Sequence, residues 1–160
     1  MYATLYIARV NNVLHGSRQV TFQEKGVWVY GVLTAVVSAV YFVFLAGQIR
    51  STAVGEIGYQ IPMVAAIAVS IVLFIVATIA ITIASPADAD KADQRDKDID
   101  RHGELIGYYV VAVGCLPVLV LAMVRADQFW IANAMYLTGV AGALVSSAVK
   151  AIDYRRGFWR

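Results

Sequence analysis

The side chains best suited to chemistry gather in one segment, the charged loop (residues 85–104), which reads SPADADKADQRDKDIDRHGE. Carboxylates and imidazole rings bind divalent cations, and a guanidinium group binds phosphate. Five of its side chains could together hold a cation and a phosphate headgroup: Asp96, Asp100, Arg101, His102 and Glu104. The alternative is that they are solvated charges beside an apolar segment. We favour it because no spacing in the chain matches a metal, phosphate-loop or triad motif convincingly. We therefore predict no catalytic residue, no metal site and no cofactor.

The charged loop is also a candidate surface for a protein partner. It carries seven acidic and four basic side chains, whereas residues 150–160 have a net charge of +3, so the two segments should attract each other. Ser85, Pro86 and Asp88 have the spacing of a capped helix start, which predicts a helix beginning at Pro86. The mixed charges favour contact with a cytosolic protein through Arg95, Asp96, Lys97, Asp98 and Arg101.

The elements that position this loop must be membrane-spanning helices. Hydrophobic residues make up 60% of the 160-residue chain and charged residues 15%, against roughly 45–50% and about 25% in soluble domains. A soluble domain of this size cannot bury such an excess. A single cysteine excludes a disulfide scaffold, and the low polarity excludes a disordered chain. A net charge of +2 spread over several segments argues against a nucleic-acid binder. An integral membrane protein remains.

Four stretches without charged residues predict four transmembrane helices, because about 20 residues cross a hydrocarbon core of roughly 30 Å. The predicted fold is all-α, a four-transmembrane-helix bundle over residues 21–160, with spans at 26–47, 60–84, 105–124 and 128–149. Eleven of the thirteen Lys and Arg residues lie in the N-terminal segment, the charged loop and the tail. This bias predicts that both termini face the cytoplasm.

Residues 1–20 precede the first span. Their apolar residues fall near one helical face, which predicts an amphipathic helix lying on the inner leaflet. A flexible segment is the alternative. A cleavable signal is not predicted, because the long apolar run and the small-residue cleavage site are missing.

Small residues recur every four positions along the predicted spans, which lets helix backbones approach closely in a membrane. The candidates for helix packing are Gly31, Ala35, Ala39, Gly103, Gly107, Thr138, Gly142 and Ser146. They could serve packing within one bundle, or contacts in a homo-oligomer or with another membrane protein. Asn133 and Gln128 are expected to hydrogen-bond across helices, with the lining of a cavity as the alternative. Only a tight turn fits between the third and fourth spans, and in it Arg125 and Asp127 could pair.

Several segments together resemble a group of small four-helix integral membrane proteins of actinobacteria. They are TFQEKGVWVYGVLT, the charged loop continued as SPADADKADQRDKDIDRHGELIGYY, ADQFWIANAMYL and the tail YRRGFW. The resemblance covers residues 21–159, and the charged loop is its most specific part. It implies a four-helix architecture and a bacterial plasma membrane, and it implies no reaction.

The leading functional hypothesis is a non-enzymatic membrane module that acts through helix–helix contacts and through the charged loop. Membrane lipids, a second copy or another membrane protein are the expected partners, and no nucleic acid is expected. One alternative is a small oligomeric channel or transporter lined by hydroxyl groups, and another is an enzyme acting on lipid headgroups at the cytosolic face. The hydroxyl path would comprise Ser70, Thr78, Thr82, Thr138 and Ser146.

Overall fold

The computed structural model describes residues 22–84 and 94–156, and all regular structure within them is helical. The elements are α2 (Phe22–Ile49), the short 3-10 helix η1 (Val54–Glu56), α3 (Gln60–Ala84), α4 (Gln94–Met123) and α5 (Gln128–Arg156). Each of the four long helices is long and apolar enough to cross a membrane. The prediction of an all-α fold with four long apolar helices is thus confirmed for the described residues. The predicted amphipathic helix at 1–20 and the predicted helix start at Pro86 lie outside those residues.

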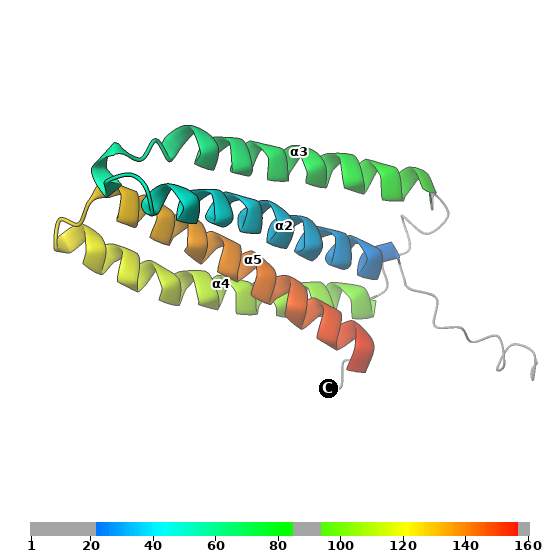
Figure 1. Cartoon of the computed structure of the whole chain (residues 1–160). Helices are drawn as coiled ribbons and strands as arrows, with labels where there is room; N and C mark the ends of the chain where they lie inside the picture. Colours follow the sequence, from blue (N-terminus) through cyan, green and yellow to red (C-terminus); the bar gives the residue numbers. More distant parts are fainter. Residues whose placement is uncertain (1–21, 85–93, 157–160) are drawn as a thin grey trace, which may run out of the picture.

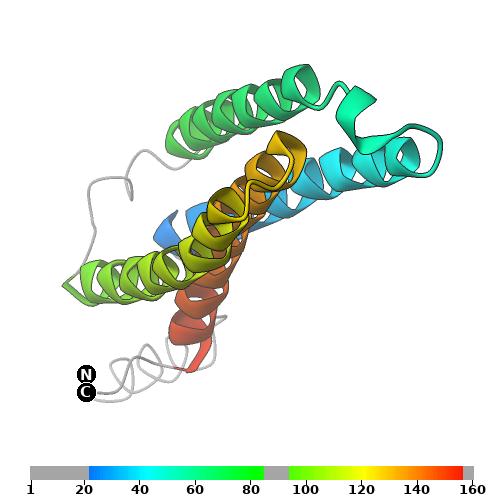
Figure 2. The ribbon, with the colours of Figure 1, turned by 90° about the vertical axis from the view of Figure 1, so that its left-hand side faces the viewer.

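The four long helices lie side by side in the order α3, α2, α5, α4 (Figure 1). Extensive contacts join α3 to α2, α2 to α5, and α5 to α4. As a result of this order, α3 and α4 lie at the two ends of a curved row of helices (Figure 2). No residue of α3 is buried, because the helix packs extensively against α2 alone.

Along the length of the helices, the two ends of the molecule differ in chemistry. The hairpin end comprises residues 50–59 between α2 and α3 and residues 124–127 between α4 and α5, on the left of Figure 1. A buried apolar cluster lies there, formed by Tyr41, Leu45, Ile57 and Phe129. The charged end comprises the starts of α2 and α4 with the ends of α3 and α5. The apolar cluster therefore anchors the start of α3, and the charged end holds the site described below.

The helices extend beyond the predicted spans. Helix α3 has the predicted bounds, but α4 begins at Gln94 rather than near 105, and α5 continues past 149 to Arg156. The reason is that charged residues end an apolar stretch without ending a helix, since Lys, Arg and Glu are good helix formers. The charged residues from Gln94 onward are consequently positioned by the first turns of α4.

The turn between α4 and α5 is closed by backbone hydrogen bonds. The N–H of Ala126 donates to the carbonyl of Leu121 at 2.9 Å, and the N–H of Arg125 donates to the carbonyl of Ala122 at 3.1 Å. This is the Schellman pattern, which places the residue after the helix in the left-handed region. Arg125 occupies that position with a φ of 56°, where glycine is the usual residue.

Asp127 caps the start of α5. Its Oδ1 accepts a hydrogen bond from the N–H of Phe129 at 2.8 Å, the geometry of an N-cap. The expected pairing of Asp127 with Arg125 is wrong, because within the described residues Asp127 forms no ion pair with Arg125 and its carboxylate satisfies the helix start instead.

Candidate functional site

The seam between α4 and α5 is the most extensive contact among the described helices, and glycines let the two backbones approach each other. A Cβ atom on Gly107 would lie 2.9 Å from the Cβ of Ser146, and one on Gly142 would lie 2.5 Å from Cγ2 of Val111. Both distances are too short for carbon atoms in contact. The structure brings five of the predicted packing residues together along this seam: Gly103, Gly107, Thr138, Gly142 and Ser146.

Gly114 also belongs to this seam, although it was not among the predicted packing residues. A Cβ atom there would lie 2.6 Å from Cγ2 of Thr138, and the Thr138 hydroxyl donates to the Gly114 carbonyl at 3.2 Å. The sequence feature that could have identified Gly114 is its distance of seven residues from Gly107, because residues seven apart share one helical face.

Only one of the three predicted packing residues on α2 faces another helix closely. Gly31 faces Ser147 of α5, with a Cβ position only 3.1 Å from the Ser147 Cβ, whereas Ala35 and Ala39 are exposed. Each step of four residues rotates the position by about 40° around a helix, so two steps carry Ala39 off the face of Gly31. Steps of seven rotate by only about 20°, and Ser38, seven residues after Gly31, is buried.

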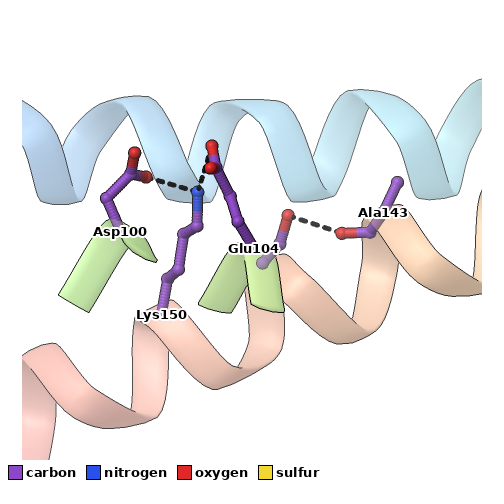
Figure 3. A network of polar contacts seen from close by, with 5 residues as sticks. Asp100, Glu104, Ala143 and Lys150 are labelled. Carbon is purple, nitrogen blue, oxygen red and sulfur yellow. Dashed lines mark hydrogen bonds and ion pairs between the residues drawn. The ribbon is translucent and has the colours of Figure 1, made fainter. Parts of the chain in front are cut away.

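At the charged end, Lys150 of α5 lies between two carboxylates of α4 (Figure 3). Its ammonium Nζ contacts Asp100 Oδ1 and lies 3.7 Å from Glu104 Oε1. The Lys150 side chain is only 13% exposed, while those of Asp100 and Glu104 are 57% and 51% exposed. The stem of Lys150 passes directly over Gly103, where a Cβ would clash with it. The expected attraction between the acidic loop and the basic tail takes this form.

Two further contacts join the same ends of α4 and α5. His102 Nδ1 lies 2.7 Å from Asp153 Oδ2. Burial raises the pKa of Tyr154 above its usual range, and a hydrogen bond with Asp96 and the charge of that carboxylate raise it further. These contacts hold the polar part of α5 against α4.

The five side chains proposed to bind a cation and a phosphate headgroup do not converge. His102 pairs with Asp153, Asp96 with Tyr154, and Asp100 and Glu104 with Lys150. Among residues 22–84 and 94–156, no three His, Cys, Asp or Glu side chains are grouped as metal ligands. The sequence could not show this separation, because α5 supplies the partners of these four groups.

The candidate partner-binding residues also separate by exposure. Arg95, Lys97 and Arg101 are exposed, whereas Asp96 and Asp98 are half-buried. Asp98 accepts a 3.5 Å hydrogen bond from Gln94, and Asp96 contacts Tyr154. Among these five residues, the basic side chains are therefore the more exposed.

A cavity of about 600 Å³ lies between the four helices at the charged end. Asp100, Glu104 and Lys150 line it together with apolar side chains from all four helices, including Phe74 and Ile81 of α3. Hydropathy alone gave no sign of it, because each span is apolar on every side. The cavity exists because α3 and α4 lie at opposite ends of the curved row.

A second cavity, of about 800 Å³, continues from the first toward the hairpin end. The two share Tyr30, Phe74 and Ala143 as lining residues. The rings of Tyr30 and Phe74 meet edge to face, with centroids 5.1 Å apart, so this aromatic pair marks the boundary between the cavities. Together they form one apolar groove beside α3.

The predicted hydroxyl path is not assembled within one copy of the chain. Thr78 and Ser146 line the first cavity and Ser70 lines the second, but Thr138 is buried between α4 and α5. The hydroxyls of Ser70, Thr78, Thr82 and Thr138 each donate to a carbonyl of their own helix. These hydroxyls already have intrahelical partners.

Comparison of the chain with protein-family models, with curated proteins and with solved structures found no match.

Proposed function

We propose that this chain is a multi-pass membrane protein that works without catalysis, by associating with a second copy of itself and with a cytosolic partner. The observation that carries the proposal is the isolation of α3, which has no buried residue and packs extensively against α2 alone. The proposed location is a bacterial plasma membrane, and it rests on the resemblance to small membrane proteins of actinobacteria.

The exposed side of α3 is uncovered within one copy of the chain and is therefore available to an identical helix. Helices associate in membranes through close packing and interhelical hydrogen bonds, because lipid tails are as apolar as their side chains. Helix α3 has no glycine, and its hydroxyls at Ser70, Thr78 and Thr82 bond within the helix, so little fixes it inside its own bundle. Two copies related by a twofold axis would cover the side of α3 that faces away from α2.

The proposed orientation puts the charged end in the cytoplasm. It is supported by the distribution of Lys and Arg, since the hairpin end contains only Arg50 and Arg125. The exposed side chains of Arg95, Lys97 and Arg101 then face the cytosol. Their charge favours a partner with an acidic surface.

Disulfide cross-linking in native membranes tests the α3 contact. Single cysteines at Val72, Ile75 or Ile79 of α3, in a Cys115→Ala background, should give disulfide-linked dimers, because these side chains are 51–57% exposed on one face. The matched controls are cysteines at Leu116, Leu119 and Val120 of α4, which are equally exposed at 56–60%. Dimers at the α4 positions in place of the α3 positions, or at neither set, would contradict the proposal.

Charge reversal tests the cytosolic contact. The Lys97→Glu and Arg101→Glu double variant should lose a co-purifying acidic protein, as measured by quantitative mass spectrometry of affinity-purified material. Lys25→Glu, which reverses an exposed charge at the same end of the molecule on α2, is the control and should retain the partner. Equal recovery from both variants would exclude this surface.

A further inference from the structure

The cavity at the charged end has a polar mouth and apolar walls, as a site for an amphiphile must. Its polar lining includes Asp100, Glu104 and Lys150, and its walls include Val27, Phe74 and Val111. A closed four-helix bundle would fill this volume with its own side chains. Here α3 and α4 lie at opposite ends of the curved row (Figure 2), so this volume is left open to another molecule.

The charges at the mouth select the sign of the ligand. Two carboxylates face one ammonium group, which leaves a net charge of −1. The ammonium group of Lys150 lies between the two carboxylates (Figure 3). The Lys150 side chain is largely buried, whereas those of Asp100 and Glu104 are each more than half exposed. Glu104 is the more weakly paired of the two, at 3.7 Å from Lys150 Nζ. An incoming group therefore meets carboxylate oxygens, which accept hydrogen bonds and favour a cation that can donate them.

The depth of the cavity matches one leaflet of a bilayer. Along α5 its lining runs from Lys150 to Gly142, which at 1.5 Å per residue is about 12 Å. Half of a hydrocarbon core is about 15 Å. The second cavity continues the apolar path beyond Phe74. A molecule with a charged head and a long apolar tail fits this geometry.

We infer that the cavity binds one phospholipid whose headgroup carries a primary ammonium, such as phosphatidylethanolamine, with the ammonium at Glu104 and Asp100 and an acyl chain along α3. A primary ammonium has three N–H donors for these carboxylates, whereas a choline headgroup has none. An anionic headgroup is repelled by the net negative mouth. The inference rests on the proposed membrane insertion, and it adds a ligand that the association proposal does not require.

Native mass spectrometry tests the headgroup preference. The full chain is purified and supplied with equal amounts of phosphatidylethanolamine, phosphatidylcholine and phosphatidylglycerol. The wild type should retain phosphatidylethanolamine about three- to five-fold over the other two, as expected for a partly exposed charge pair. Glu104→Gln should abolish the preference. Glu56→Gln, which removes an exposed carboxylate at the hairpin end, should leave it intact. Enrichment of phosphatidylglycerol, or the same preference in both variants, would overturn the inference.

A matched pair on α3 tests the cavity. Thr78 lines the cavity and Thr82 does not, but both are exposed and both donate to a carbonyl of their own helix. Thr78→Trp should fill the cavity and reduce retention of phosphatidylethanolamine at least about three-fold, and Thr82→Trp should not. Equal retention would place the lipid elsewhere and refute the site. If α3 dimers form without any lipid preference, only this inference fails; if the protein is recovered without membranes, both proposals fail.

Discussion

At the scale of single residues, one buried hydrogen bond ties α2 to α5. The Tyr41 hydroxyl donates to Asn133 Oδ1 at 2.6 Å, and Asn133 Nδ2 donates to the carbonyl of Phe129 at 2.8 Å. Tyr41 is 3% exposed and Asn133 7%. The expectation that Asn133 hydrogen-bonds across helices is therefore confirmed, although the sequence did not identify Tyr41 as its partner.

Replacing Tyr41 with phenylalanine should destabilise the protein by about 1 kcal/mol, the usual value of an interhelical hydrogen bond in a membrane. The variant leaves Asn133 Oδ1 without its donor. The measurement is the free energy of unfolding in detergent, and Tyr108→Phe is the control because that side chain is 67% exposed. Equal stability of Tyr41→Phe and wild type would show that the bond contributes nothing.

Gly107→Ala should destabilise the seam between α4 and α5 by about 1–3 kcal/mol, because the new Cβ forces two helices apart. It would lie 2.9 Å from Ser146 Cβ and 3.0 Å from the Gly142 carbonyl oxygen. Gly139→Ala is the control on the neighbouring helix, where a Cβ has no neighbour within 4 Å. Thermal unfolding in detergent distinguishes them, and a similar loss in both variants would contradict the packing argument.

Tyr154 predicts a pH dependence at the charged end. Its raised pKa means that the folded protein keeps the phenol proton where the unfolded chain has lost it. Its contribution to stability is thus fully present below about pH 10 and is lost as the pH rises further, by at most about 1.4 kcal/mol per pH unit. Thermal midpoints of Tyr154→Phe should therefore fall less steeply than wild type above about pH 10. Identical curves for Tyr154→Phe and the wild type would exclude the effect.

At the scale of elements, the sequence predicted the helices better than their ends. Uncharged stretches mark where a helix lies in a membrane, and α3 has the predicted bounds. The first turns of α4 and the last turns of α5 carry charged side chains. A prediction based on uncharged stretches therefore leaves these turns out. Helical periodicity still placed Gly107 and Gly142 correctly in a packing row, since they face each other across the seam.

The turn between α4 and α5 is the one described position where backbone strain can be relieved. Arg125 has a φ of 56°, which costs a residue with a side chain about 1–2 kcal/mol relative to glycine. Arg125→Gly should therefore raise stability by about 0.5–1 kcal/mol after the added freedom of the unfolded chain is deducted. Arg50→Gly removes the same charge from the same end of the molecule and should not stabilise. Chemical denaturation in detergent compares them, and destabilisation by Arg125→Gly would refute the assignment.

At the scale of the whole molecule, the order of the helices could not be predicted from the sequence. Every span is apolar around its circumference, so hydropathy does not show which sides meet. The row α3, α2, α5, α4 follows from specific contacts, such as Gly31 against Ser147 and Tyr41 against Asn133. The grooved side of the molecule, and with it the candidate lipid site, therefore became visible only in three dimensions.

Topology is tested by labelling intact cells with a membrane-impermeant maleimide in a Cys115→Ala background. Gly55→Cys, in the exposed η1 connection, should react from outside, because the hairpin end is predicted to be external. Arg95→Cys, at the exposed start of α4, should react only after permeabilisation. Labelling of Arg95→Cys in intact cells would reverse the proposed orientation.

The solitary position of α3 has a consequence for how the protein tolerates change. A helix that buries nothing and contains no glycine sets few demands on side-chain shape within its own bundle, so in a deep mutational scan that reads out folding of the single chain most exchanges among Leu, Ile, Val and Phe along its outer side should be silent. The α4–α5 seam should tolerate almost none, because its glycines leave no room for a methyl group. Positions on the outer side of α3 that do not tolerate substitution would then identify the residues that contact a molecule outside the bundle.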